Sequence, residues 1–215
     1  MGRLVDIFLA GGPVMWPLLA MSVLAVALCF ERAAFWLALR RQASPQWFES
    51  IAEALARADW NKAADLLNRR KGPHAAFLEP LLTAGRRSAD PAVIEGVARE
   101  RVESLRPIVE RFSVTLSAII TAAPMLGILG TVIGIIVSFQ VLAGAEMRDP
   151  GAVAGGIAQA LITTAFGLTV ALITLFPYTA FRAQADRCFN RFEVLTGMVI
   201  AATAHHPSAV PSAKS

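Results

Sequence analysis

The stretch Ala123–Phe139, APMLGILGTVIGIIVSF, lies within Phe112–Ala145, the longest run of this chain without a charged side chain. It is apolar enough to enter the hydrocarbon of a membrane. It nevertheless contains a proline, three glycines, a threonine and a serine. Such residues in a lipid-buried helix indicate either close helix packing or a polar pathway, so the direction in which they face decides their meaning.

Charge-free runs of this kind occur three times in the 215 residues. Ile7–Phe30, Phe112–Ala145 and Pro150–Phe181 contain no Asp, Glu, Lys or Arg, and each exceeds the roughly 20 residues that cross a hydrocarbon core. We therefore predict an all-α membrane protein with three transmembrane helices. The first run is longer than the apolar core of a secretory signal, and Glu31-Arg32 follows it in place of a cleavage site, so we expect it to be retained.

Basic residues predict the orientation of these spans. Most of the 20 Lys and Arg residues lie between Glu31 and Arg111, and a second group follows Phe181, whereas Arg3 and Arg148 stand alone in the other two segments. The positive-inside rule then places the N-terminus and the short Gly144–Ala154 loop outside, and the middle segment and the C-terminus in the cytoplasm. The sequence has no clustered basic face with stacking aromatics, which argues against nucleic-acid binding.

Helix-start signals organise the middle segment. Ser44-Pro45 and Asp90-Pro91 each combine an N-cap residue with a proline at the first helical position. Two short amphipathic helices are predicted between them, with Asp59 as the cap of the second, and Gly72-Pro73 interrupts the helical pattern.

The second and third spans are expected to continue into the cytoplasm as long helices. From Asp90 to Gly144 we predict one unbroken helix that Pro107 and Pro124 bend. The third span is likewise predicted to continue past Phe181. The uncharged second-span run would measure about 50 Å as a helix, more than the bilayer needs, which is expected if it is buried against copies of itself in an oligomeric helical bundle.

These observations predict an order of segments along the chain. The segments are a periplasmic end with the first transmembrane helix (1–39), a cytoplasmic helical domain (40–111), the second transmembrane helix (112–143), a short periplasmic loop (144–152), the third transmembrane helix (153–181), its cytoplasmic extension (182–204) and a disordered tail (205–215).

Small and hydroxylated residues share one face of each later span. They recur every three or four positions, as Ser113, Ser117, Thr121, Pro124, Gly127, Thr131, Gly134 and Ser138 in the second span, and as Gly156, Ala160, Thr163/Thr164, Gly167, Ala171, Thr174 and Tyr178 in the third. Two interpretations remain open. The stripes allow close helix packing, as in Gly130-x-x-x-Gly134, or the hydroxyls line a narrow pathway.

The sequence gives little support for proton transfer by this chain alone, for metal binding or for catalysis. The second and third spans contain no Asp, Glu, His, Lys or Arg, so a titrating group for proton transfer would have to come from another subunit. Cys29 and Cys188 are expected to be small buried residues, and His205-His206 has no further metal ligands beside it. We predict no enzyme activity, no cofactor and no metal site.

Three quoted segments carry a resemblance to a known family. GGPVMWPLLAMSVLAVALCFERAAFW, LSAIITAAPMLGILGTVIGIIVSF and GGIAQALITTAFGLTVALITLFPYTAF resemble, in order, the three spans of the ExbB/TolQ/MotA proton-channel family. The likeness covers nearly the whole chain. Because the flagellar-motor relatives typically have four spans, three spans favour the ExbB-like branch.

The resemblance implies a homo-pentamer in the bacterial inner membrane, with a pore lined by the second and third spans. A small single-span partner similar to ExbD or TolR would sit in the pore and carry a membrane Asp. Thr131 and Thr164 correspond to the family's two threonines and would face that Asp, and Pro124 corresponds to its signature proline. The candidate pathway residues are Thr131, Thr164, Thr163, Gln159, Ser138 and Thr174, and the candidate packing or kink residues are Pro124, Gly127, Gly130, Gly134, Gly167 and Pro177.

Two positions depart from the family pattern. Gln159 stands where ExbB and TolQ proteins commonly have a Glu, and an amide cannot titrate. The family's third-span proline corresponds to Ile173, and a proline appears instead at Pro177, one turn later.

The resemblance therefore predicts a proton-channel subunit of a motor that uses the proton motive force to energise outer-membrane processes, such as transport that depends on a TonB-like protein. A Tol-type subunit of the cell envelope is an alternative. A non-conducting oligomeric scaffold is another, because it explains the glycines equally well.

Overall fold

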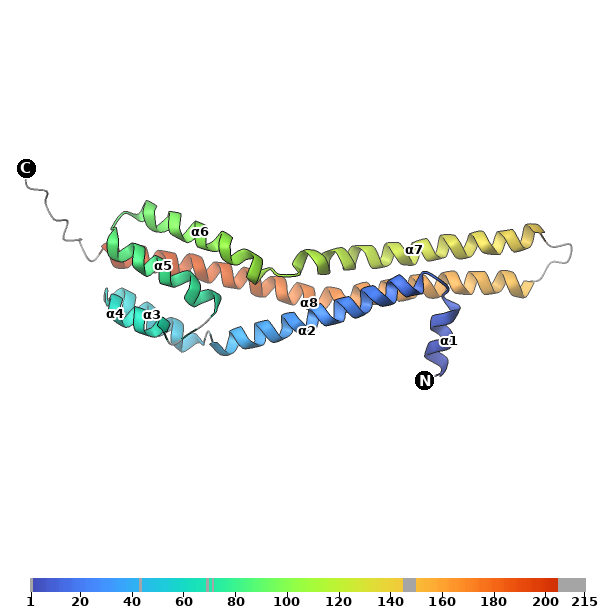
Figure 1. Cartoon of the computed structure of the whole chain (residues 1–215), viewed down its shortest axis with the longest axis horizontal. Helices are drawn as coiled ribbons and strands as arrows, with labels where there is room; N and C mark the ends of the chain where they lie inside the picture. Colours follow the sequence, from blue (N-terminus) through green and yellow to red (C-terminus); the bar gives the residue numbers. More distant parts are fainter. Residues whose placement is uncertain (1, 43, 69, 71, 145–149, 205–215) are drawn as a thin grey trace, which may run out of the picture. The chain divides into compact units, whose positions relative to one another are not determined.

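The structure, a computed structural model, describes residues 2–42, 44–68, 70, 72–144 and 150–204. The predicted tail with His205-His206 and most of the predicted loop 144–152 lie outside these residues. All regular elements in the described part are α-helices (Figure 1). They are α1 (Gly2–Ala10), α2 (Met15–Gln42), α3 (Pro45–Ala56), α4 (Trp60–Asn68), α5 (Pro73–Arg87), α6 (Pro91–Val109), α7 (Ser113–Gly144) and α8 (Pro150–Ala204).

Three of these helices are long and apolar enough to cross a membrane. They correspond to Met15–Arg41 in α2, Ser113–Ala143 in α7 and Gly151–Ala204 in α8, with mean hydropathies of 1.9, 2.2 and 1.9 in their most apolar windows. The predicted all-α fold with three membrane-spanning helices, the last two of them long, is confirmed. The third span also continues past Phe181 as predicted, to Ala204.

The chain divides into two compact units. The first unit contains Met1–Arg32 and Phe112–Ala180, and the second contains Ala33–Arg111 and Phe181–Ser215. Helices α2 and α8 each contribute one part to both units.

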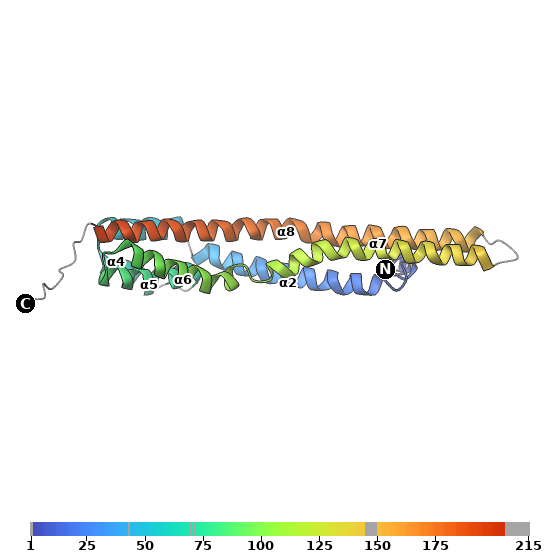
Figure 2. The ribbon, with the colours of Figure 1, turned by 90° about the horizontal axis from the view of Figure 1, so that it is seen from above.

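The first unit contains α1, the first part of α2, α7 and the first part of α8. Its core joins Met15 and Leu18 of α2 to Ile119 and Ala123 of α7 and to Val170 of α8. The first half of α8 runs beside α7 in both views of the ribbon (Figures 1 and 2).

The first charge-free run does not form one helix. α1 ends at Ala10, Gly12 adopts a φ of 72°, and α2 begins at Met15. Gly12 takes this left-handed conformation without strain because it has no Cβ, and Pro13 fits the turn that follows it. Ile7–Phe30 is therefore split, and the spanning helix begins later than the charge pattern suggests.

The second unit is a helical domain with an aromatic core. Phe77 of α5 stacks on Phe192 of α8, with ring centroids 4.2 Å apart and planes 9° from parallel. Leu81, Ile94 and Leu195 are fully buried around them. Aromatic pairs of this kind bury a large apolar area and stabilise the domain beyond that burial.

The predicted helix starts in this unit are confirmed. The backbone N–H of Trp47 donates to the Ser44 hydroxyl at 3.4 Å, and that of Ala92 donates to the Asp90 carboxylate at 2.9 Å. Asp59 accepts from the backbone N–H of Lys62 at 3.0 Å, as expected of a cap. Each bond satisfies an amide that the first turn of a helix leaves unpaired.

The prediction of one unbroken helix from Asp90 to Gly144 is wrong. α6 ends at Val109, and α7 begins only at Ser113. Phe112 lies between them with a φ of 64°, a left-handed conformation that a right-handed helix cannot contain. Pro107 is tolerated inside α6, whereas Phe112 ends the helical path.

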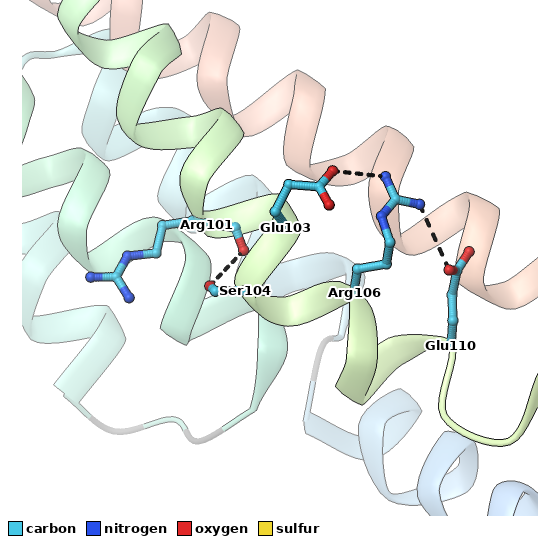
Figure 3. Close-up of polar contacts among 5 residues, drawn as sticks. All are labelled: Arg101, Glu103, Ser104, Arg106 and Glu110. Carbon is cyan, nitrogen blue, oxygen red and sulfur yellow. Dashed lines mark hydrogen bonds and ion pairs between the residues drawn. The ribbon is translucent and has the colours of Figure 1, made fainter.

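Ion pairs accompany the end of α6. Arg106 donates to the Glu103 carboxylate at 3.3 Å and lies 3.7 Å from that of Glu110, so it links the last turn to the residue that caps it (Figure 3). The Ser104 hydroxyl donates to the Arg101 carbonyl at 2.9 Å in the same stretch. These side chains are exposed, so each ion pair stabilises the helix end only slightly.

Candidate functional site

The candidate site lies where α7 and α8 approach each other in the first unit. A Cβ placed on Gly134 would lie 2.8 Å from the Gly156 carbonyl oxygen, and one on Gly167 would lie 2.5 Å from the Ala123 carbonyl oxygen. At Gly127 the distance to the Thr164 Cα is 3.0 Å. Only glycine fits at such separations, so these residues set the spacing of the two helices.

Gly130 belongs to the same contact surface. A Cβ on Gly130 would overlap the Thr163 side chain, which packs directly against the α7 backbone. Together, the four glycines predicted to serve packing lie at this interhelical surface, namely Gly127, Gly130, Gly134 and Gly167.

Three of the predicted pathway hydroxyls are buried within this helix pair. Ser138, Thr163 and Thr174 are 4%, 1% and 1% exposed. Ser138 donates to its own helix at Gly134 and is 3.2 Å from the Val153 carbonyl of α8. Thr163 and Thr174 donate to Ala160 and Val170 in their own helix. Their geometry is that of packing residues, which is one of the two interpretations that the sequence leaves open.

Thr131 and Thr164 occupy a different position. Both are only half-buried. Thr164 donates its hydroxyl proton to the Gly127 carbonyl at 2.9 Å, and Thr131 donates to Ile128 at 2.6 Å. In an α-helix the Gly127 carbonyl also accepts from the amide of Thr131, four residues on, so the two threonines meet at one carbonyl group.

The two threonines also lie at the margin of an exposed apolar surface. On α7, Met125, Ile128, Val132, Ile135 and Phe139 follow one another by three or four residues and are 45–66% exposed. On α8, Leu161, Leu168, Leu172 and Phe176 are 48–71% exposed. A surface of this extent is suited to lipid or to another protein helix.

Gln159 packs against the turn between α1 and α2. Its side-chain amide occupies the space beside Gly12 that a Cβ would fill. Gly11 is similarly close to Met15 and Ile162. The sequence did not predict this contact, although the Gly11-Gly12-Pro13 turn signal was a hint that a backbone approaches closely there.

The predicted kink residues lie inside continuous helices. Pro124 is within α7 and Pro177 is within α8. A proline has no N–H, so the carbonyls of Ile120 and Ile173, four residues earlier, receive no helical bond from these positions. Each proline thus creates a local weakness in the helical ladder of a membrane span.

An ion pair between a buried arginine and an exposed glutamate lies in the first unit, at Glu31-Arg32. The Arg32 guanidinium, 3% exposed, donates to both Glu31 carboxylate oxygens at 2.7 and 3.0 Å. It also lies 5.8 Å from the centroid of the Phe112 ring, the residue at the break before α7. The residue pair that closes the first span therefore contacts the start of the second.

The site offers no carboxylate, histidine or basic side chain. α7 and the first 32 residues of α8, up to Phe181, contain no Asp, Glu, His, Lys or Arg. Across the described residues, no group of three or more His, Cys, Asp or Glu side chains is placed to hold a metal ion. The helix pair can therefore offer hydroxyls, carbonyls and apolar contacts to a passing or docking group.

Comparison with known proteins shows which family of membrane proteins this chain is similar to. Residues 69–194 match the model of the MotA/TolQ/ExbB proton channel family. A putative biopolymer transport protein, ExbB-like 3 of Synechocystis sp., is 33% identical over 194 residues, which cover 89% of this chain and 90% of that protein. An ExbB homolog of Methanothermobacter thermautotrophicus is 27% identical over 92% of this chain and 69% of its own length. The Tol-Pal system protein TolQ of Pseudomonas aeruginosa is 37% identical over 48% of this chain and 46% of its own.

Proposed function

Because this chain belongs to the MotA/TolQ/ExbB proton channel family, we propose that it is the channel-forming subunit of an inner-membrane motor driven by the proton motive force. The observation that carries this proposal is the meeting of Thr131 and Thr164 at the Gly127 carbonyl, within the two charge-free runs Phe112–Ala145 and Pro150–Phe181. The motor would energise an outer-membrane process, such as transport that depends on a TonB-like protein.

The proposed assembly is a homo-pentamer with α7 and α8 around a central pore. The exposed apolar rows of these two helices would then pack against neighbouring copies or lipid. A single-span partner similar to ExbD or TolR would occupy the pore and supply the carboxyl group that this chain lacks. In the orientation we propose, the N-terminus is periplasmic, and the second unit and the C-terminus are cytoplasmic.

The chemistry of the two threonines suits such a partner. An ionised Asp in an apolar pore costs about 2.5–3.5 kcal/mol on insertion scales, whereas the membrane potential supplies about 2.3 kcal/mol per charge per 100 mV. The hydroxyl protons of Thr131 and Thr164 point to backbone carbonyls, so their oxygens can accept a bond from a protonated Asp. Rotation of the hydroxyls would let them donate to the ionised form and offset part of its cost.

The half-buried amide of Gln159 takes no part in this proposed proton transfer. It cannot titrate, and it lies against the turn at Gly12. We propose that the titrating step belongs entirely to the partner.

A non-conducting scaffold is the second candidate function. It is favoured by one observation, the burial of Ser138, Thr163 and Thr174 between α7 and α8, because these hydroxyls serve packing within one chain. A Tol-type motor in place of a TonB-type one would use the same channel and differ only in its client.

Reconstitution tests the two functions against each other. The chain should be co-expressed with a single-span, Asp-bearing protein similar to ExbD or TolR from the same organism, purified as a complex and placed in liposomes with a proton gradient. The motor proposal predicts co-purification and proton flux that disappears when the partner Asp becomes Asn. A stable complex without flux would support the scaffold, and failure of the two proteins to associate would overturn the proposed partnership.

A further inference from the structure

The second unit contains a cavity whose lining is rich in positive charge. The cavity has a volume of about 230 Å³ and is lined by residues of α2, α3, α5 and α8. Arg40, Arg187 and Arg191 contribute three guanidinium groups, and none of the described residues that line it is an Asp or a Glu. The cavity therefore presents positive charge that no neighbouring carboxylate in its wall neutralises.

Two buried ring nitrogens at this cavity have no hydrogen-bond partner among the described residues. Trp36 and His74 are 5% and 4% exposed, and both line the cavity. The Trp36 Nε1 and the His74 Nδ1 are buried and unpaired. Because buried polar groups are nearly always hydrogen-bonded, two unpaired nitrogens in residues that line one cavity are donors available to a polar ligand.

Contacts on the other side of the His74 ring favour a free donor at Nδ1. The His74 Nε2 lies 3.7 Å from the Cys188 Sγ. When the thiol donates to Nε2, the single ring proton of neutral histidine resides on Nδ1. Burial, and then the nearby Arg191, lower the pKa of His74 to about 4, so the ring is neutral at pH 7.

Two of the three arginines, Arg40 and Arg191, are oriented by uncharged groups. Arg40 donates to the Gln184 side-chain oxygen at 3.2 Å, and the Arg191 guanidinium lies 4.7 Å from the centroid of the Phe48 ring. Both contacts fix the direction of a guanidinium without cancelling its charge. An oriented guanidinium can bind an oxyanion through two parallel N–H bonds, which an ammonium group cannot do.

We propose that this cavity binds a phosphate group, with Arg187 and Arg191 supplying charge and the Trp36 Nε1–H and the His74 Nδ1–H donating to its oxygens. The volume is smaller than that of pockets for drug-sized ligands, so the bound part is a phosphate with a small substituent. Two sources present this chemistry, the headgroup of an anionic phospholipid and a soluble phosphate ester. α2, which carries Arg40 and Arg41 in its last turn, is a membrane-spanning helix, so a headgroup has access to its end.

The test uses the full-length protein and a pair of charge-matched variants. Arg187→Gln with Arg191→Gln removes two charges from the cavity wall. Arg87→Gln with Arg99→Gln removes two exposed charges elsewhere in the same unit.

Native mass spectrometry of protein from nanodiscs of phosphatidylcholine and phosphatidylglycerol measures retained lipid. Thermal unfolding with added glycerol 3-phosphate, or with inorganic phosphate against chloride at equal ionic strength, measures soluble ligands.

The proposal predicts that the unchanged protein and the Arg87/Arg99 variant bind equally well, whereas the Arg187/Arg191 variant binds at least about tenfold more weakly. Selective retention of phosphatidylglycerol identifies the source as lipid, and stabilisation by the soluble phosphates alone identifies it as a soluble ester. Absence of binding to either probe overturns the proposal. An equal loss of binding in both double variants also overturns the proposal, because the loss would then depend on the total charge of the protein and not on this cavity.

A further variant, Trp36→Phe, tests the role of the Trp36 N–H separately from that of the arginine charges. Trp36→Phe keeps an aromatic ring in the wall and removes the unpaired N–H together with part of the buried indole. Its melting temperature without ligand measures the packing lost with the smaller ring, whereas its affinity for the bound phosphate, measured on the folded variant, should drop about tenfold. An affinity equal to that of the unchanged protein would exclude Trp36 as a donor and contradict the proposed site.

Discussion

The hydroxyl of Thr164 in α8 donates to the backbone carbonyl of Gly127 in α7, with 2.9 Å between the two oxygens. This bond ties two membrane-spanning helices together at a point where no side chain separates their backbones, because residue 127 is a glycine. It also places Thr164 beside Thr131, whose amide bonds the same carbonyl in the helical ladder. Helix packing and the proposed ion pathway therefore depend on the same few atoms.

The close approach of α7 and α8 predicts that Gly134→Ala destabilises the protein. The new Cβ would lie 2.8 Å from the Gly156 carbonyl oxygen and 2.9 Å from the Ala160 Cβ, and a backbone atom cannot move aside cheaply. Overpacking of this kind costs about 1–3 kcal/mol. Thermal unfolding in detergent should show a lower melting temperature.

The matched control is Gly155→Ala, one residue before the contact. A Cβ at Gly155 meets no atom within 4 Å. Alanine also favours a helix over glycine, so this variant should be as stable as the parent or slightly more so. Equal melting temperatures for the two variants would contradict the packing described here.

The N-cap of α6 predicts a smaller effect in the second unit. Asp90→Ala removes the carboxylate that accepts from the Ala92 amide and should lower the free energy of unfolding by about 1 kcal/mol. Asp90→Ser, which retains a capping oxygen, should recover most of that loss. If both variants lose equal stability in a chemical denaturation experiment, the cap is not the cause.

Some of this architecture is predictable from the sequence, and the reasons differ from element to element. The membrane spans are predictable because an apolar run of about 20 uncharged residues rarely forms anything other than a transmembrane helix. The helix starts at Ser44 and Asp90 are predictable because an N-cap residue and a proline act on the adjacent turn alone. The break at Phe112 is not, because a phenylalanine at positive φ has no sequence signal and is held by its surroundings, including Arg32.

The role of the small and hydroxylated residues in the second and third spans is not predictable from the sequence, for a different reason. Close packing and a polar lining both place small or hydroxylated residues every three or four positions, so the pattern cannot separate them. Only the three-dimensional contacts show that Ser138, Thr163 and Thr174 are buried while Thr131 and Thr164 lie at the margin. The contact between Gln159 and Gly12 joins residues far apart in the chain, which periodicity cannot predict.

Burial of His74 predicts that stability depends on pH. Burial, followed by the nearby charge of Arg191, lowers the pKa of His74 from 6.5 to about 4. The unfolded chain therefore binds a proton between pH 6.5 and pH 4 that the folded chain does not bind, so folding stability falls as the pH drops through this window. The loss attributable to this group is about 3 kcal/mol at its largest.

Melting temperatures recorded from pH 7.5 to pH 4 measure this effect. The control is His74→Asn, which keeps a polar side chain but cannot titrate, and which should flatten the slope between pH 6.5 and pH 4. Arg191 and Cys188, which face His74, are unchanged in both proteins. A slope that is the same in the variant would show that other groups cause the pH dependence.

The central claim is that the hydroxyls of Thr131 and Thr164 serve a proton-carrying group from a partner protein. Proton flux through the reconstituted complex tests it most directly, with Thr131→Val and Thr164→Val combined. The controls are Thr131→Ser with Thr164→Ser, which keeps both hydroxyls, and Thr115→Val with Thr169→Val, which removes two exposed hydroxyls from the same helices. The account predicts that flux falls at least about tenfold in the double valine variant and persists in both controls, with assembly intact in all three. Undiminished flux through an intact double valine complex would contradict it.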